Sequence, residues 1–120
     1  MVNIVVTPSE NEEVFPYVVI EAMCSGRPVV GSRIGGITEQ LGDGKRGLLV
    51  DPGDSIGFAE AICKLLDDPN LVDKFVMFGK EYASKFTIAR HVNALIEVYR
   101  NILTPLSGNW QKYGNLNLPE

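Results

Sequence analysis

The stretch NIVVTPSENEEVFPYVVIEAMCSGRPVVGS, residues 3–32, contains the pattern that decides the fold. Residues 3–7 and residues 28–32 are short β-branched runs, which are typical of buried strands. Between them, residues 16–25 predict a helix, because proline is tolerated at the first helical position and Gly26 supplies the backbone freedom that ends a helix. Strand, helix and strand in this order predict a βαβ unit with parallel strands.

The rest of the chain extends this unit. Residues 47–50 predict a third strand after the glycine-rich region 35–47, and Asp54 can cap a helix whose apolar face holds Phe58, Ile62, Leu65 and Leu66. Two more amphipathic helices are expected over residues 70–84 and 87–103. The fold class is therefore α/β, with about three parallel strands and flanking helices. We expect one domain over residues 1–103 and a tail over residues 104–120.

Composition excludes several classes of function. The net charge is -4 among 120 residues, so the chain offers no general basic field for nucleic acid. Its apolar runs are far shorter than the roughly 20 residues of a membrane-spanning helix, and no leader pattern opens the sequence, so the expected location is the cytoplasm. Cys24 and Cys63 fall in helical segments and are predicted to be buried or half-buried thiols, although their spacing alone also allows one disulfide.

The loop after the first strand carries the candidate chemistry. Ligands of open α/β sheets bind at the carboxyl ends of strands, and the unpaired amides of a helix start attract phosphate. Glu13 lies in the loop, and Glu21 lies five residues after Pro16, about 7.5 Å along a helix. A carboxylate can accept two hydroxyls at once, which suits Glu21 to a ribose diol, while Glu13 would face a sugar. Charge alone also allows a solvated acidic loop and an exposed helix position.

A string of spaced motifs favours a ligand site at these glutamates over a solvated acidic loop. The motifs are Pro8-Ser9, Glu-x7-Glu from Glu13 to Glu21, Glu-Ala-Met followed by Ser-Gly-x-Pro-Val-Val, Gly35-Gly36-x-x-Glu39 and Gly47-x-Leu-Val. This string resembles the retaining glycosyltransferases of the GT-B fold, in particular the glycogen-synthase-like and mannosyltransferase-like family 4. The resemblance covers about residues 3–103. It implies that residues 1–103 form a partial nucleotide-sugar-binding domain, a Rossmann-like half-domain that is the C-terminal part of a GT-B fold. In one departure, Val14 stands where that family usually has glycine after the first glutamate.

The resemblance implies specific roles for this site. Glu13 would be the catalytic or positioning carboxylate beside the donor sugar, and Glu21 would bind the ribose. Backbone amides at Phe15, Tyr17 and Val18 would contact the sugar and diphosphate, and no metal or cofactor is expected besides the nucleotide-diphosphate sugar itself.

The glycine pair and the residues near it form a second part of the predicted site. Gly35 and Gly36 would allow close approach of backbone to ligand, with Glu39 near the nucleotide, although a plain tight turn explains the pair equally well. The role of Arg33, near the mouth of the expected pocket, stays open.

The resemblance also implies an incomplete enzyme. Such enzymes have two facing domains, so this chain is expected to be a donor-binding fragment, inactive alone, that works with a missing N-terminal half, a partner chain or further copies of itself. The first strand would then be an unpaired edge, covered by self-association, the tail or a separate chain. A non-catalytic sugar-nucleotide-binding or assembly module and a GT-B sugar-nucleotide epimerase are the alternatives. The base, the donor sugar and the acceptor cannot be named from the sequence.

Overall fold

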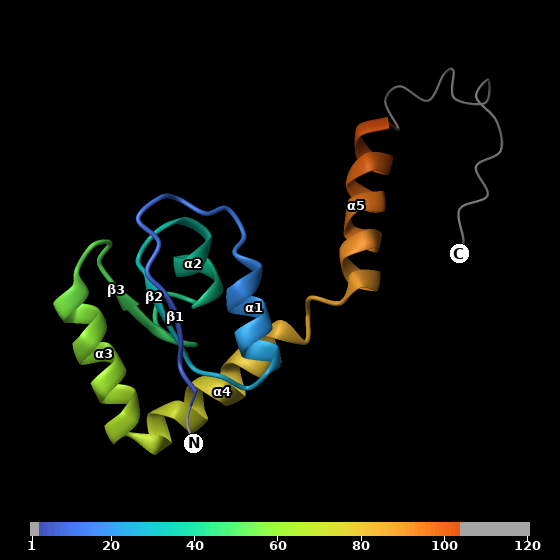
Figure 1. Ribbon diagram of the computed structural model, residues 1–120. Coiled ribbons are helices and arrows are strands. Elements are labelled where there is room, and N and C mark those ends of the chain that lie inside the picture. The colour runs from blue at the N-terminus through green and yellow to red at the C-terminus, as the bar shows by residue number, and fades with distance from the viewer. Residues whose placement is uncertain (1–2, 104–120) are drawn as a thin grey trace. The chain divides into compact units, whose positions relative to one another are not determined.

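The computed structural model describes residues 3–103 and divides them after Lys85 into two units (Figure 1). The first unit contains three parallel strands, β1 (Val5–Thr7), β2 (Val29–Ser32) and β3 (Leu48–Val50), in the order β1-β2-β3. Its helices are α1 (Tyr17–Cys24), α2 (Gly35–Gln40), α3 (Ser55–Asp67) and α4 (Pro69–Ala83). The expected βαβ unit and parallel sheet are confirmed. As expected, β1 lies at an edge of this sheet, and what covers that edge stays a prediction.

Apolar residues cover both faces of the sheet because successive residues of a strand point to opposite sides. Val29 belongs to a core with α1 and α2, whereas the adjacent Val30 belongs to a core with α3. Helix α4 contributes to both cores, with Ala83 in the first and Phe75 in the second. Figure 1 shows α1 and α3 on opposite sides of the strands. The result is a unit with helices on both faces of the sheet, an arrangement in which ligands commonly bind at the carboxyl ends of the strands.

Helix ends follow from local chemistry. In α1, the amide of Gly26 donates to the Met23 carbonyl and that of Arg27 donates to the Ala22 carbonyl, a Schellman arrangement that requires the positive φ of Gly26, 67°. Asp54 caps α3 by accepting from the Gly57 amide at 2.9 Å, as the sequence predicts. Pro16 is the N-cap of α1 rather than its first helical residue, a shift of one position.

The sequence did not predict one helix, and two sequence-based expectations were wrong. The glycine-rich region after β2 begins with a helix, α2, because Ile37 and Leu41 are fully buried against the sheet and this packing outweighs the poor helix propensity of two glycines. Cys24 and Cys63 are exposed rather than buried or half-buried, since both lie on the outward faces of their helices. Leu66, expected on the buried face of α3, is also exposed.

The second unit contains helix α5 (Ile88–Leu103), whose start is capped by the Thr87 hydroxyl accepting from the Arg90 amide at 3.2 Å. This helix is amphipathic, as the sequence predicts, but its apolar residues Leu95, Tyr99 and Ile102 are exposed. Within residues 3–103, no helix has the length and apolar character needed to cross a bilayer. The predicted tail, residues 104–120, lies outside the described residues.

Gln40 gives a first testable prediction. Its side chain is 1% exposed, and neither its amide nitrogen nor its amide oxygen has a hydrogen-bond partner among the described residues. An unsatisfied buried polar group costs about 1–3 kcal/mol. Gln40→Met keeps the volume and removes the polar atoms, so Tm measured by calorimetry is expected to rise, by about 4–8 °C per kcal/mol. Gln40→Glu should lower Tm because it buries a charge. A Gln40→Met variant melting at or below the unchanged chain would contradict the prediction.

Candidate functional site

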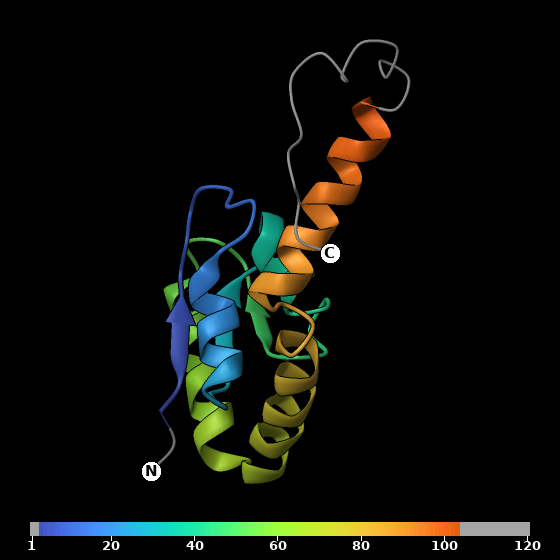
Figure 2. The same ribbon diagram turned by 90° about the vertical axis from the view of Figure 1, so that its right-hand side faces the viewer.

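The loop of residues 8–16 joins β1 to α1 at the carboxyl ends of the parallel strands. Figure 2 shows this loop and helix α2 at the end toward which the strand arrows point. Open α/β sheets bind ligands at this end, because the connections there leave helix starts and loop backbone accessible. The loop that carries Glu13 and the start of α1 therefore lie on the expected side of the sheet.

The start of α1 has no side-chain cap. Pro16 has extended backbone angles, φ -72° and ψ 108°, and carries no group that could accept from the first turn, which also lacks an acidic residue. Val19 donates its amide to the Pro16 carbonyl at 3.2 Å, whereas the amides of Tyr17 and Val18 have no acceptor among the described residues. These two donors and the helix dipole make the start of α1 electropositive.

Glu21 lies one helical turn after Tyr17 on the exposed face of α1. The opposite face is buried and consists of Val19, Ile20, Ala22 and Met23. This amphipathic pattern fixes the orientation of the helix, because rotating it would expose Met23 and bury the Glu21 carboxylate. The side chain of Glu21 is thus available to a ligand that lies along α1 from its first turn.

Glu13 is held in the loop by two hydrogen bonds. The Ser9 hydroxyl donates to Glu13 Oε1 at 2.7 Å, and the Glu13 carbonyl accepts from the Gly36 amide at 2.6 Å. Glu13 as a whole is half-buried. The sequence identified Glu13 but not the role of Ser9. A hydroxyl four residues before a loop carboxylate does not predict a hydrogen bond between them, because the backbone conformation of loops varies widely.

The glycine pair supports the loop directly. A Cβ at Gly35 would lie 2.7 Å from the Glu13 carbonyl oxygen, and one at Gly36 would overlap with the Val14 carbonyl oxygen, well inside the 3.0 Å limit of real contacts. Gly35 also has a positive φ of 39°. The close approach predicted for this pair is thus made by the chain's own loop. Contact of either glycine with a ligand stays a prediction.

Apolar side chains surround the start of α1. Phe15 and Tyr17 pack edge to face with ring centroids 5.6 Å apart, and Tyr17 and Val18 are exposed. Val14, which stands in place of the expected glycine, is 91% exposed. Its close contact with Gly36 is made by its carbonyl oxygen and not by its side chain. The valine side chain therefore changes the surface beside Glu13 without filling space inside the loop.

Glu39 and Arg33 lie apart from this cluster. The charge of Glu39 acts on Tyr82 of α4, and its carbonyl accepts from Arg46 Nη2 at 3.0 Å. Arg33 pairs with Asp43 at 3.2 Å and more loosely with Asp51 at 3.8 Å. The structure thus brings Glu13, Gly35 and Gly36 together and Phe15 beside Tyr17, while Glu39 faces another helix.

Among residues 3–103, no three His, Cys, Asp or Glu side chains are arranged to hold a metal ion.

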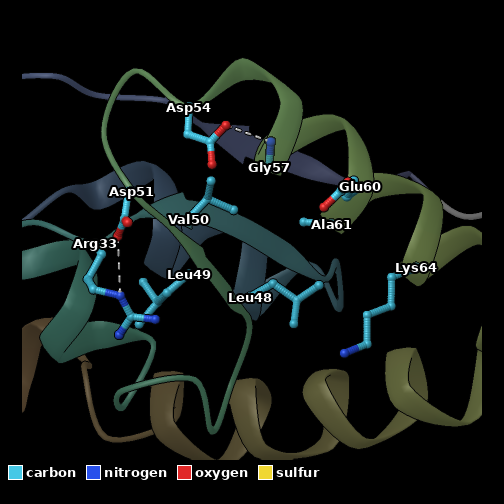
Figure 3. Close-up of a pocket in the computed structure, with 10 residues that line it drawn as sticks. All are labelled: Arg33, Leu48, Leu49, Val50, Asp51, Asp54, Gly57, Glu60, Ala61 and Lys64. Atoms are coloured by element: carbon cyan, nitrogen blue, oxygen red, sulfur yellow. Dashed lines mark hydrogen bonds and ion pairs between the residues drawn. The ribbon is translucent and has the colours of Figure 1, made fainter.

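A separate hollow of about 410 Å³ runs along the outer side of β3 and is bordered by Arg33 at one end and Lys64 at the other (Figure 3). Its charges are mixed, and several are already engaged: Arg33 points to Asp51, and Asp54 is turned toward the Gly57 amide. The first contact joins the ends of β2 and β3, and the second caps α3. The two charged residues of the lining that remain, Glu60 and Lys64, are opposite in sign.

Comparisons with known proteins indicate one family. A family model described as glycosyl transferases group 1 matches residues 1–82. The D-inositol 3-phosphate glycosyltransferase of Corynebacterium urealyticum is 35% identical over 102 residues, which cover 85% of this chain and 24% of that protein.

Solved structures agree with this match. Sucrose-phosphate synthase from Thermosynechococcus elongatus superimposes with a TM-score of 0.77 at 33% identity, covering 86% of this chain and 26% of that one. Anabaena HepE in complex with UDP gives a TM-score of 0.73 at 29% identity, covering 83% and 28%. The chain therefore spans about a quarter of the length of the relatives it matches.

Proposed function

The chain belongs to the group 1 glycosyl transferases, and from this premise we propose that it forms the donor-binding part of a retaining enzyme that uses a nucleotide-diphosphate sugar. Its Rossmann-like unit with three parallel strands matches GT-B glycosyltransferase structures, as the sequence predicts. Because the chain spans about a quarter of its relatives' length, transfer of the sugar to an acceptor is proposed for an enzyme larger than these 120 residues. The expected cytoplasmic location, lack of a cofactor and lack of activity in the isolated chain belong to the same proposal.

One observation supports this function above all: the start of α1 offers the unpaired amides of Tyr17 and Val18 between two carboxylates, Glu13 before the helix and Glu21 within it. A diphosphate at the helix start would accept from these amides and be stabilised by the dipole. Glu21 would accept hydroxyls from the ribose, one turn further along the exposed face.

Glu13 would then lie on the sugar side of the diphosphate. When the bond between sugar and diphosphate breaks, negative charge grows on the leaving phosphate, and fixed donors at a helix start stabilise that charge without reorganising. The Ser9 hydroxyl holds one oxygen of Glu13, so the carboxylate is oriented before a ligand arrives. We propose UDP as the nucleotide, because HepE, a structural relative, is solved in complex with UDP.

Binding of UDP to the full 120-residue chain tests this function. At a UDP concentration of 100 times Kd, the folded state is expected to gain about 2.7 kcal/mol, measured as a rise in Tm by differential scanning calorimetry. Uridine should give a much smaller rise at equal concentration, because it lacks the diphosphate that meets the helix start. Equal shifts with uridine and UDP, or none with any nucleoside diphosphate, would contradict the proposed site.

A further inference from the structure

A second, smaller hollow lies between the residues that precede β3 and the carboxyl-terminal end of α4. Its volume is about 260 Å³ and its lining consists of Lys45, Arg46, Phe78, Glu81, Tyr82 and Lys85. All six belong to the first unit, and none belongs to the loop or to the start of α1. Three of them are cationic and one is anionic, in a chain whose net charge is -4. The local excess of positive charge is thus opposite in sign to that of the whole protein.

Arg46 is fixed in this hollow by the protein itself. Its Nε donates to the Gln40 carbonyl at 2.7 Å, its Nη2 donates to the Glu39 carbonyl at 3.0 Å, and its guanidinium lies 3.8 Å from the centre of the Tyr82 ring. These carbonyls belong to the last turn of α2, which needs donors. The Nη1 group of Arg46 has no acceptor among the described residues. The guanidinium is thus held in place by its other nitrogens and can still donate to a ligand through Nη1.

The other two cations are not neutralised. Within residues 3–103, neither Lys45 nor Lys85 forms an ion pair, and both are exposed. Burial raises the pKa of the Tyr82 hydroxyl; Arg46 opposes this shift and Glu39 adds to it. Tyr82 therefore stays a neutral phenol at neutral pH and contributes no negative charge that would offset the lysines.

We propose that this hollow binds the dianionic phosphate group of a small molecule. Arginine offers a rigid planar fork and lysine a mobile point charge, the combination that commonly binds phosphate. The volume is below the range of about 300–1,000 Å³ typical of drug-sized ligands, which fits a phosphate-bearing small molecule better than a nucleotide sugar. Phe78 and Tyr82 provide an apolar wall for the remainder of such a molecule. The site is thus separate from the proposed donor site.

The experiment is a titration of the full 15N-labelled chain, observed by NMR, with inorganic phosphate, with glycerol 3-phosphate, and with sodium chloride at matched ionic strength. Phosphate or glycerol 3-phosphate is expected to shift the amide signals of Lys45, Arg46, Tyr82 and Lys85, whereas chloride is not. Tighter binding of glycerol 3-phosphate would identify a phosphorylated small molecule as the ligand, and equal binding would identify the free ion. Shifts confined to Tyr17 and Val18, or none with either phosphate, would overturn the proposal.

Variants separate this site from the donor site. The double change Lys45→Gln and Lys85→Gln is expected to weaken phosphate binding about tenfold or more, because two charge-assisted contacts are lost. Lys45→Arg with Lys85→Arg should retain it. Lys74→Gln removes an exposed charge from α4 outside the hollow and should change nothing. The stabilisation by UDP should persist in the double glutamine variant, so the two proposals can fail independently. Unchanged phosphate affinity in that variant would refute the site.

Discussion

Gly36→Ala is expected to abolish UDP binding at concentrations that saturate the unchanged chain, and to lower Tm. The added methyl group would overlap with the Val14 carbonyl oxygen, which is backbone and cannot turn away as a side chain would. Either the loop moves away from α2 or α2 moves away from the sheet. Forcing an extra methyl group into a packed site costs about 1–3 kcal/mol. Loop movement would also break the 2.6 Å hydrogen bond from the Gly36 amide to Glu13 and displace its carboxylate.

The measurement is calorimetric titration with UDP together with a thermal melt of each variant. Thr38→Ala is the matched control, because it lies in the same short helix, half-buried, and adds no atom facing the loop. The φ of Gly36 is not in the left-handed region, so strain of the backbone angles does not confuse the result. Retention of full affinity by Gly36→Ala would show that the loop's contact with α2 does not position the binding groups.

Glu21→Ala is expected to weaken UDP binding about 100-fold while leaving Tm of the free chain nearly unchanged. Two hydrogen bonds from ribose hydroxyls to a carboxylate are worth about 1.5 kcal/mol each or more, and 1.4 kcal/mol corresponds to a tenfold change in Kd. Stability should be preserved because the side chain is exposed and lies on the outward face of α1.

Glu12→Ala is the control for Glu21, since it removes the same charge from an exposed position in the neighbouring loop and should alter Kd only slightly. Deoxyribose in place of ribose provides a second comparison. 2′-Deoxy-UDP should bind the unchanged chain less tightly than UDP, and the Glu21→Ala variant should no longer distinguish the two. A Glu21→Ala variant that binds UDP as tightly as the unchanged chain would exclude a ribose contact at this position.

Much of the architecture could be predicted because its signals are local. The β-branched runs around Val5 and Val29 and the stop at Gly26 define the first βαβ unit without knowledge of tertiary contacts. Helix α2 could not be predicted in this way, since two glycines argue against a helix and only the burial of Ile37 and Leu41 overrides them. The exposure of Cys24 likewise depends on which face of α1 meets the sheet.

The sequence singles out Glu13 and Glu21 of the candidate site, but it does not predict how the site is arranged. The spacing of Glu13 and Glu21 identifies both carboxylates and the helix start between them. The contact between the loop and the glycine pair joins residues more than twenty positions apart, and spacing does not reveal whether a glycine makes room for a ligand or for the chain itself. The cationic hollow around Arg46 combines residues from two distant segments and has no motif of its own.

Helix α4 has a consequence for how the first unit unfolds. Because Val72 and Phe75 complete the core beneath α3 while Ala83 completes the core beneath α1, detaching this one helix would open both layers together. The two halves of the sheet are then mechanically linked and should lose their protection against hydrogen exchange in a single concerted step, as one foldon. The donor loop and the cationic hollow, which depend on opposite ends of the strands, thus draw their rigidity from one shared cooperative scaffold.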